Sequence, residues 1–129
     1  MKKIAFFASF VFLTTIGHAA DDPKADLEKE LADRTAGEPV RCIDLRAVRG
    51  LRVIGTSTVI AKRGHKITYR NDPAGGCPAQ RFGTTIFAAS DKGQRLCVGD
   101  AITLIRIETD DIVGACQLGM WTPYLSADD

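Results

Sequence analysis

The chain has 129 residues, 17 Lys and Arg, 16 Asp and Glu, and a formal net charge of +1. This length corresponds to one domain, and the nearly balanced charge argues against a nucleic-acid-binding protein. Four cysteines in so short a chain are typical of a disulfide framework, which exported proteins use to reinforce a modest core.

Residues 1–20 have the layout of a secretory signal peptide. Lys2 and Lys3 precede an apolar run over 4–16, and small residues follow up to Ala20. The apolar run is shorter than the about 20 residues that a membrane-spanning helix needs, although an uncleaved anchor is the alternative interpretation. We predict cleavage after Ala19 or Ala20 and a periplasmic or secreted mature protein without a transmembrane segment. It would carry 15 basic and 16 acidic side chains, a net charge of −1.

Residues 21–38 are predicted to form an acidic helical arm. Asp22 is a suitable N-cap, Pro23 suits the first helical turn, and Gly37 is a suitable C-terminal stop. Only two leucines, four residues apart, form an apolar stripe. The arm is therefore expected either to dock by one edge or to be mobile.

Residues 39–129 are predicted to form a single β-rich domain. Short runs of β-branched and aromatic residues alternate with Gly and Asp turns at intervals of about 8–12 residues. We expect a mainly β fold, a small antiparallel barrel or sandwich of six to eight short strands with an N-terminal helical arm, stapled by disulfides. The runs are 56–62, 66–70, 84–88, 95–98, 101–108 and 112–118.

The cysteines are expected to form two disulfides. Cys42, Cys77, Cys97 and Cys116 contain neither a C-x-x-C redox motif nor the close pairs of a zinc site. We favour the pairs Cys42–Cys116 and Cys77–Cys97. Thiol chemistry at a free Cys77 is the alternative, and no metal or other cofactor is expected.

The motifs RCIDL, YRNDPAGGCPAQRFG, RLCVGDAI and CQLG occur in this order along the chain. Together they resemble an uncharacterised family of small exported bacterial proteins with a four-cysteine domain of unknown function. The resemblance covers about residues 38–120. It implies export and one compact domain, and it implies no activity, so no catalytic residue is carried over.

Charge is distributed unevenly. Residues 39–109 carry twelve bases and five acids, whereas 21–38 carry seven acids and 110–129 four. The basic residues are either ordinary solvated positions or a face that binds an anionic partner and is shielded by the protein's own acidic ends.

The leading hypothesis is a non-catalytic binding domain. Its predicted surface joins Arg63, His65 and Lys66, around an exposed hairpin turn, with Arg70 and the loop 75–80. The partner is expected to be an anionic envelope component or an acidic protein. A role as inhibitor of, or immunity protein against, an envelope enzyme fits this class.

Trp121 and Tyr124 are a second candidate for binding. They either cover the core or form an exposed aromatic pair of the kind found at interface hot spots.

The alternative function is a small hydrolase. It would use a pair of carboxylates drawn from Asp44, Asp72 and Asp100. Nothing in their spacing indicates that any two of them converge, and a salt bridge from Asp44 to Arg46 or Arg81 is the simpler expectation.

Overall fold

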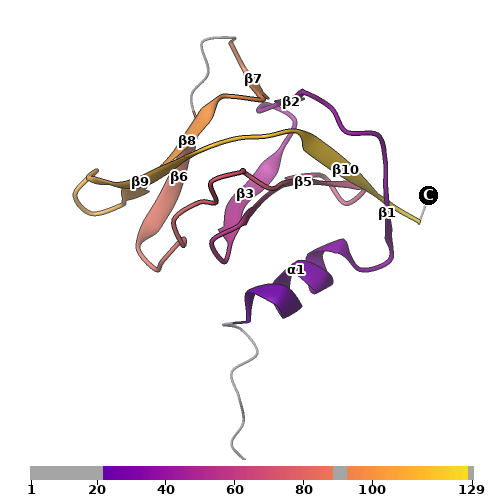
Figure 1. Cartoon of the computed structure of the whole chain (residues 1–129), viewed down its shortest axis with the longest axis horizontal. Helices are drawn as coiled ribbons and strands as arrows, with labels where there is room; N and C mark the ends of the chain where they lie inside the picture. The colour runs from indigo at the N-terminus through magenta and orange to yellow at the C-terminus, as the bar shows by residue number, and fades with distance from the viewer. Residues whose placement is uncertain (1–21, 89–92, 128–129) are drawn as a thin grey trace, which may run out of the picture.

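In a computed structural model of the chain, which describes residues 22–88 and 93–127, one helix precedes a series of short strands (Figure 1). The predicted signal peptide lies outside these ranges. Within them, no helix is long and apolar enough to cross a bilayer. In chain order the described elements are α1 (Pro23–Leu31), β1 (Arg34–Ala36), β2 (Cys42–Asp44), β3 (Arg49–Ile54), β4 (Thr58–Arg63), β5 (Ile67–Asn71), β6 (Thr84–Ala88), β7 (Arg95–Cys97), β8 (Ala101–Arg106), β9 (Ile112–Gln117) and β10 (Trp121–Ser126).

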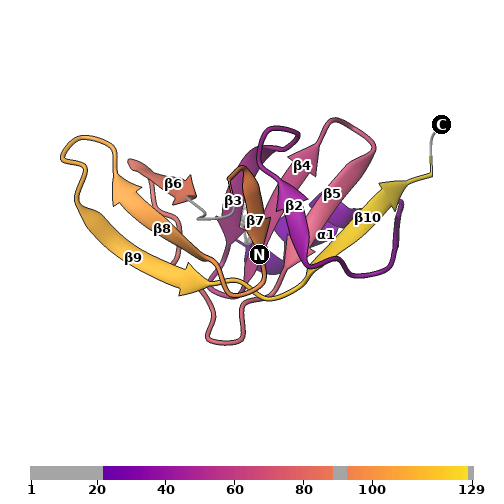
Figure 2. The same cartoon turned by 90° about the horizontal axis from the view of Figure 1, so that it is seen from above.

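The strands form three antiparallel sheets (Figure 2). The largest has the order β1-β10-β5-β4-β3, the second has the order β6-β8-β9, and β2 pairs with β7 in a two-stranded ribbon. The three-stranded sheet extends to one side of the five-stranded sheet, and in this view the ribbon overlaps the five-stranded sheet near β3 and β4. The fold is sandwich-like and does not close into a barrel, which confirms the expected mainly β architecture.

The described residues contain ten strands, more than the six to eight predicted. β1 lies inside the predicted helical arm and pairs with β10, so this part of the arm belongs to the five-stranded sheet. β3 was not among the predicted strands, because Gly50 interrupts its pattern. Gly50 has a φ of +66° and lies at a register shift in the pairing of β3 with β4. β10 contains Pro123, a residue that normally argues against an interior strand.

The core lies on the face of the five-stranded sheet opposite α1. Side chains alternate along a strand, so Val59 and Ala61 of β4 face the core while Ile60 and Lys62 face α1. This is why β4 is buried on both sides and reads as a nearly continuous apolar run. The core cluster consists of Ile43, Val53, Val59, Ala61, Cys77, Leu96, Ile102, Leu104, Cys116, Leu118 and Trp121.

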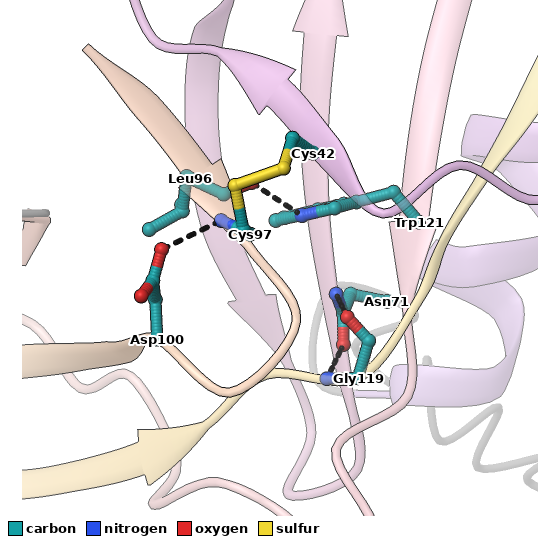
Figure 3. Close-up of a disulfide and its surroundings, with 7 residues drawn as sticks. All are labelled: Cys42, Asn71, Leu96, Cys97, Asp100, Gly119 and Trp121. Atoms are coloured by element: carbon teal, nitrogen blue, oxygen red, sulfur yellow. Dashed lines mark hydrogen bonds between the residues drawn. A yellow bond between two sulfur atoms is a disulfide. The ribbon is translucent and has the colours of Figure 1, made fainter. Parts of the chain in front are cut away.

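The ribbon is fixed to the core through Trp121 (Figure 3). The Trp121 side chain is 0% exposed, and its indole Nε1 donates a hydrogen bond of 3.2 Å to the carbonyl of Leu96 in β7. Nearby, the buried amide of Asn71 donates to the carbonyl of Gly119 and accepts from its N–H, both at 2.9 Å. Because both buried polar groups are satisfied, the turn into β10 has a fixed position.

The start of α1 agrees with the prediction, but its end does not. Asp22 caps the helix by accepting a hydrogen bond from the amide two residues later, at 3.0 Å. The helix ends at Leu31, and Asp33 takes the left-handed conformation with a φ of +58°. Aspartate tolerates this conformation, so the chain reverses before Gly37. Gly37 instead lies beside β10, where its amide donates to the carbonyl of Pro123 at 2.7 Å.

α1 docks on the five-stranded sheet through ion pairs. None of its residues is buried. Arg52 of β3 contacts Asp26 and Glu30, each at 2.8 Å, and Lys62 of β4 contacts Glu30 at 2.7 Å. The arm therefore docks by one edge, which was one of the two predicted alternatives. Its carboxylates neutralise part of the basic stretch that follows.

The pKa values of both carboxyl groups reflect this docking. The hydrogen bond from Arg52 lowers the pKa of Asp26. For Glu30, burial raises the pKa, but the hydrogen bonds from Lys62 and Arg52 outweigh it and the net direction is downward. A lowered native pKa stabilises the docked state above the ordinary carboxyl pKa of about 4. That stabilisation is lost as the pH falls through the native values.

The disulfides are Cys42–Cys97 and Cys77–Cys116, with Cα–Cα distances of 4.0 and 5.0 Å. The predicted pairs Cys42–Cys116 and Cys77–Cys97 are wrong. They assumed that the first strand lies beside the last, whereas Cys42 in β2 is directly opposite Cys97 in β7. All four cysteines are bonded, which leaves no free thiol at Cys77 and is typical of an oxidising compartment outside the cytoplasm.

Non-reducing digestion and mass spectrometry of the native protein test the pairing. We expect peptides linked through Cys42–Cys97 and Cys77–Cys116. Replacement of either pair by alanine should lower the free energy of unfolding by about 2–4 kcal/mol. A Cys42–Cys116 peptide, or a reactive thiol in the native protein, would contradict the structure.

The variant Glu30→Gln tests the docking of α1, because it removes a charge that meets both Arg52 and Lys62. At pH 6 we expect the protection of the α1 amides against hydrogen exchange to fall about tenfold, corresponding to about 1.5 kcal/mol for hydrogen bonds to charged groups. Glu28→Gln, which changes an exposed carboxylate of the same helix, is the matched control. The wild type should lose the same protection below about pH 4. Equal protection in both variants would show that the ion pairs do not hold α1.

Candidate functional site

The segment 77–83, between β5 and β6, is pinned to four other parts of the molecule: β9, the β3–β4 turn, β3, and Ile107 after β8. The Cys77–Cys116 disulfide ties its start to β9, and the Cys77 amide donates to the carbonyl of Thr56 at 2.9 Å. Gly76 has a φ of +71°, and a Cβ there would lie 2.6 Å from that same carbonyl oxygen. Only glycine allows this approach. We call residues 77–83 the pinned loop.

Further contacts hold the rest of the pinned loop. A side chain at Gly114 of β9 would collide with the ring of Pro78, so the two segments pack directly on each other. The Gln80 Oε1 accepts a hydrogen bond of 2.9 Å from the amide of Val53 on β3. At the far end, the Thr84 amide and hydroxyl both donate to the carbonyl of Arg81. The loop is thus ordered without regular secondary structure.

A pocket of about 550 Å³ opens between the pinned loop, β6, the end of β8 and the start of β9. Two arginines enter it from different elements, Arg81 from the loop and Arg106 from β8. Apolar side chains make up much of the remaining wall. The lining residues are Thr56, Pro78, Ala79, Arg81, Phe82, Thr84, Arg106 and Val113.

Neither arginine of this pocket forms an ion pair within the described part of the chain. Elsewhere, Arg46, Arg52, Lys62 and Arg70 each meet a carboxylate at 3.2 Å or less. Two uncompensated guanidinium groups in one concave site create a positive potential. Their planar N–H groups match the oxygens of a carboxylate or a phosphate. The pocket is suited to holding an anionic group.

The residues of the predicted basic surface lie in three different places in the structure. Arg63, His65 and Lys66 are exposed and line a hollow of about 570 Å³ around the β4–β5 turn. Arg70 instead faces the α1 side and is paired with Asp72 at 2.9 Å. The loop 75–80 lies at the opposite end of β4, against the β3–β4 turn. The four residues and the loop therefore do not form one surface, because β4 separates its parts.

The predicted aromatic pair is also divided. Trp121 is buried in the core, whereas Tyr124, three residues later in the same strand, faces the α1 side. Tyr124 is half-buried there, on the same side of the sheet as Arg70. An exposed Trp–Tyr binding pair is thus wrong, and the alternative expectation, that the aromatics cover the core, holds for Trp121.

A second polar pocket, of about 420 Å³, lies between the start of α1 and the five-stranded sheet. Within it, Asp72 accepts hydrogen bonds from the Thr58 hydroxyl at 2.6 Å and from Arg70 Nε at 2.9 Å. These contacts link β4 to the end of β5 and account for both carboxylate oxygens. The pocket is lined by Asp22, Pro23, Lys24, Leu27, Ile54, Ser57, Thr58, Arg70 and Asp72.

The other two carboxylates considered for a hydrolase lie on other elements. Asp44 forms the expected salt bridge with Arg46, at 3.2 Å, and the hydrogen bonds from Arg46 lower its pKa. Asp100, in the β7–β8 turn, accepts a hydrogen bond of 2.7 Å from the Cys97 amide (Figure 3). Neither contributes to the pocket that contains Asp72. Among the described residues, no three His, Cys, Asp or Glu side chains are placed to hold a metal ion.

Arg81 and Arg106 were not predicted as a pair from the sequence. They are 25 positions apart, and the density of bases drew attention to residues 46–70 instead. One sequence signal was present: Arg106 is the single charged residue of the strand that begins at Ala101, and its charge invites a functional explanation.

No protein-family model, curated protein or solved structure matches this chain. The resemblance of its four cysteine motifs to exported bacterial proteins stays a prediction.

Proposed function

We propose that this protein is an exported, non-catalytic binding domain that holds an anionic group of its partner between Arg81 and Arg106. The observation that carries the proposal is the pair of guanidinium groups in one pocket, each without a carboxylate partner in the part of the chain that the structure describes. Carboxylates and phosphates of envelope components or acidic proteins have the matching chemistry.

The surroundings of the arginines favour this role. Pro78, Ala79 and Val113 give the pocket an apolar wall beside the two guanidinium groups. Because the pinned loop is already ordered, binding would cost little conformational entropy. A small anion bound here would therefore contact two arginines whose backbones are already held in place.

Export to the periplasm or the medium is part of the same proposal. The basic and apolar start of the chain has the pattern of a signal peptide, and both disulfides require oxidising conditions to persist. Binding would then take place in the envelope or outside the cell.

Two matched double variants test the proposal. Arg81→Gln/Arg106→Gln removes two charges from the pocket, and Arg63→Gln/Lys66→Gln removes two from the β4–β5 hairpin. Titration with inorganic phosphate and with succinate, followed by amide chemical shifts at low salt, should show at least about tenfold weaker binding in the first variant only. Added salt should weaken binding to the wild type.

Both variants carry the same change in net charge, so a general electrostatic effect would weaken them equally. Equal weakening, or loss of binding only in the hairpin variant, would place the anion elsewhere and contradict the proposal.

A further inference from the structure

The most unusual residue of the pinned loop is Phe82. Its side chain is wholly exposed, although the residues on both sides are held in place. The carbonyl of Arg81 accepts two hydrogen bonds from Thr84, and the carbonyl of Gly83 accepts one of 2.9 Å from the amide of Ile107. Isolated exposed apolar residues are common. A phenyl ring on a loop pinned by so many contacts, beside two uncompensated arginines, is a more specific arrangement.

Phe82 belongs to a larger apolar surface at this end of the three-stranded sheet. Val113 shares the pocket wall with Phe82, and the amide of Ile107 is bonded to the residue that follows Phe82. We call this surface the Phe82 patch; it consists of the exposed residues Phe82, Ile107 and Val113 together with Arg81 and Arg106.

The composition of the patch is that of a protein–protein interface. Aromatic residues and arginine are the side chains enriched at interface hot spots. A preordered loop also lowers the entropic cost of association. The rigid backbone of the pinned loop therefore presents Phe82 in the manner of an anchor that fills a cavity on a partner.

The charges beside the patch argue against a membrane surface. The β8–β9 turn carries Glu108, Asp110 and Asp111, all exposed. An anionic bilayer would attract Arg81 and Arg106 but would repel the acidic turn. The turn is close to the arginines, because the amide of Arg106 donates a hydrogen bond of 2.8 Å to the carbonyl of Asp111. A protein surface can present carboxylates to the arginines without meeting the acidic turn.

We infer that Phe82 is the anchor of a protein–protein interface. Its ring enters an apolar cavity of a partner protein, and carboxylates on the rim of that cavity contact Arg81 and Arg106. This inference rests on the proposed anion-binding role of the two arginines. It adds the class of partner and the residue that gives the interface its apolar contact.

The test uses the photoreactive residue 4-benzoylphenylalanine, placed in the full chain at position 107 and expressed in the protein's native cells. Position 107 leaves Phe82 intact. Position 87 is the matched control, because Ile107 and Phe87 are 60% and 57% exposed on the same sheet. Irradiation should give a discrete protein adduct from position 107 and none of that mass from position 87.

Two variants, each combined with the probe at position 107, test whether the adduct depends on Phe82 and on the two arginines. Phe82→Ala should lower the yield of the adduct at least about tenfold without changing the melting temperature, because the ring makes no buried contact. Arg81→Gln/Arg106→Gln should lower the yield as well. Arg41→Gln, at an exposed arginine outside the patch, should leave it unchanged.

The inference is overturned if position 107 gives no adduct, an adduct with lipid only, or an adduct with a second copy of this chain. It is also overturned if Phe82→Ala leaves the yield unchanged. If that variant is neutral while the double arginine variant still lowers both the yield and the affinity for phosphate, the anchor role of Phe82 fails and the proposed anion-binding function remains.

Discussion

The Cys77–Cys116 disulfide is the constraint on which the candidate site depends. Cys77 follows the five-stranded sheet and Cys116 lies in the three-stranded sheet, so the bond joins the two sheets across 39 positions of sequence. The pinned loop has no ladder of its own, and the disulfide determines where it runs. The pairing of β6 with β8 places Thr84 opposite Arg106 and so holds Arg81 nearby, whereas the disulfide holds the side of the pocket made by Pro78 and Ala79.

The distribution of charge follows from the position of α1. The helix brings Asp26 and Glu30 to the basic residues of β3 and β4, and their contacts both dock the helix and cancel part of the local charge. The pocket of Arg81 and Arg106 lies outside this neutralised region. A chain whose total charge is close to zero thus keeps two arginines in one pocket without an ion pair in the described part of the chain.

The sequence predicted the features that depend on residues close together in the chain, such as strand positions and the cap of α1. Alternation and turn residues located most strands from β4 to β9, and Asp22 was recognised as a cap because capping involves only its immediate neighbours. The cysteine pairing could not be predicted, because it depends on the order of strands in space. For the same reason the pair of Arg81 and Arg106 was missed: it exists only after a loop and a distant strand are brought together. The density of basic residues in the sequence did not locate the site, since the acids of α1 pair with two of them, Arg52 and Lys62.

The most direct test of this account compares the affinity for inorganic phosphate of two variants that each lack one disulfide. Removal of Cys77–Cys116, with both residues replaced by alanine, should release the pinned loop and weaken binding at least about tenfold, while amide spectra show the five-stranded sheet intact. Removal of Cys42–Cys97, which lies in the ribbon away from the pocket, should leave the affinity unchanged. Equal affinities in the two variants would contradict the claim that the disulfide-held loop forms the site.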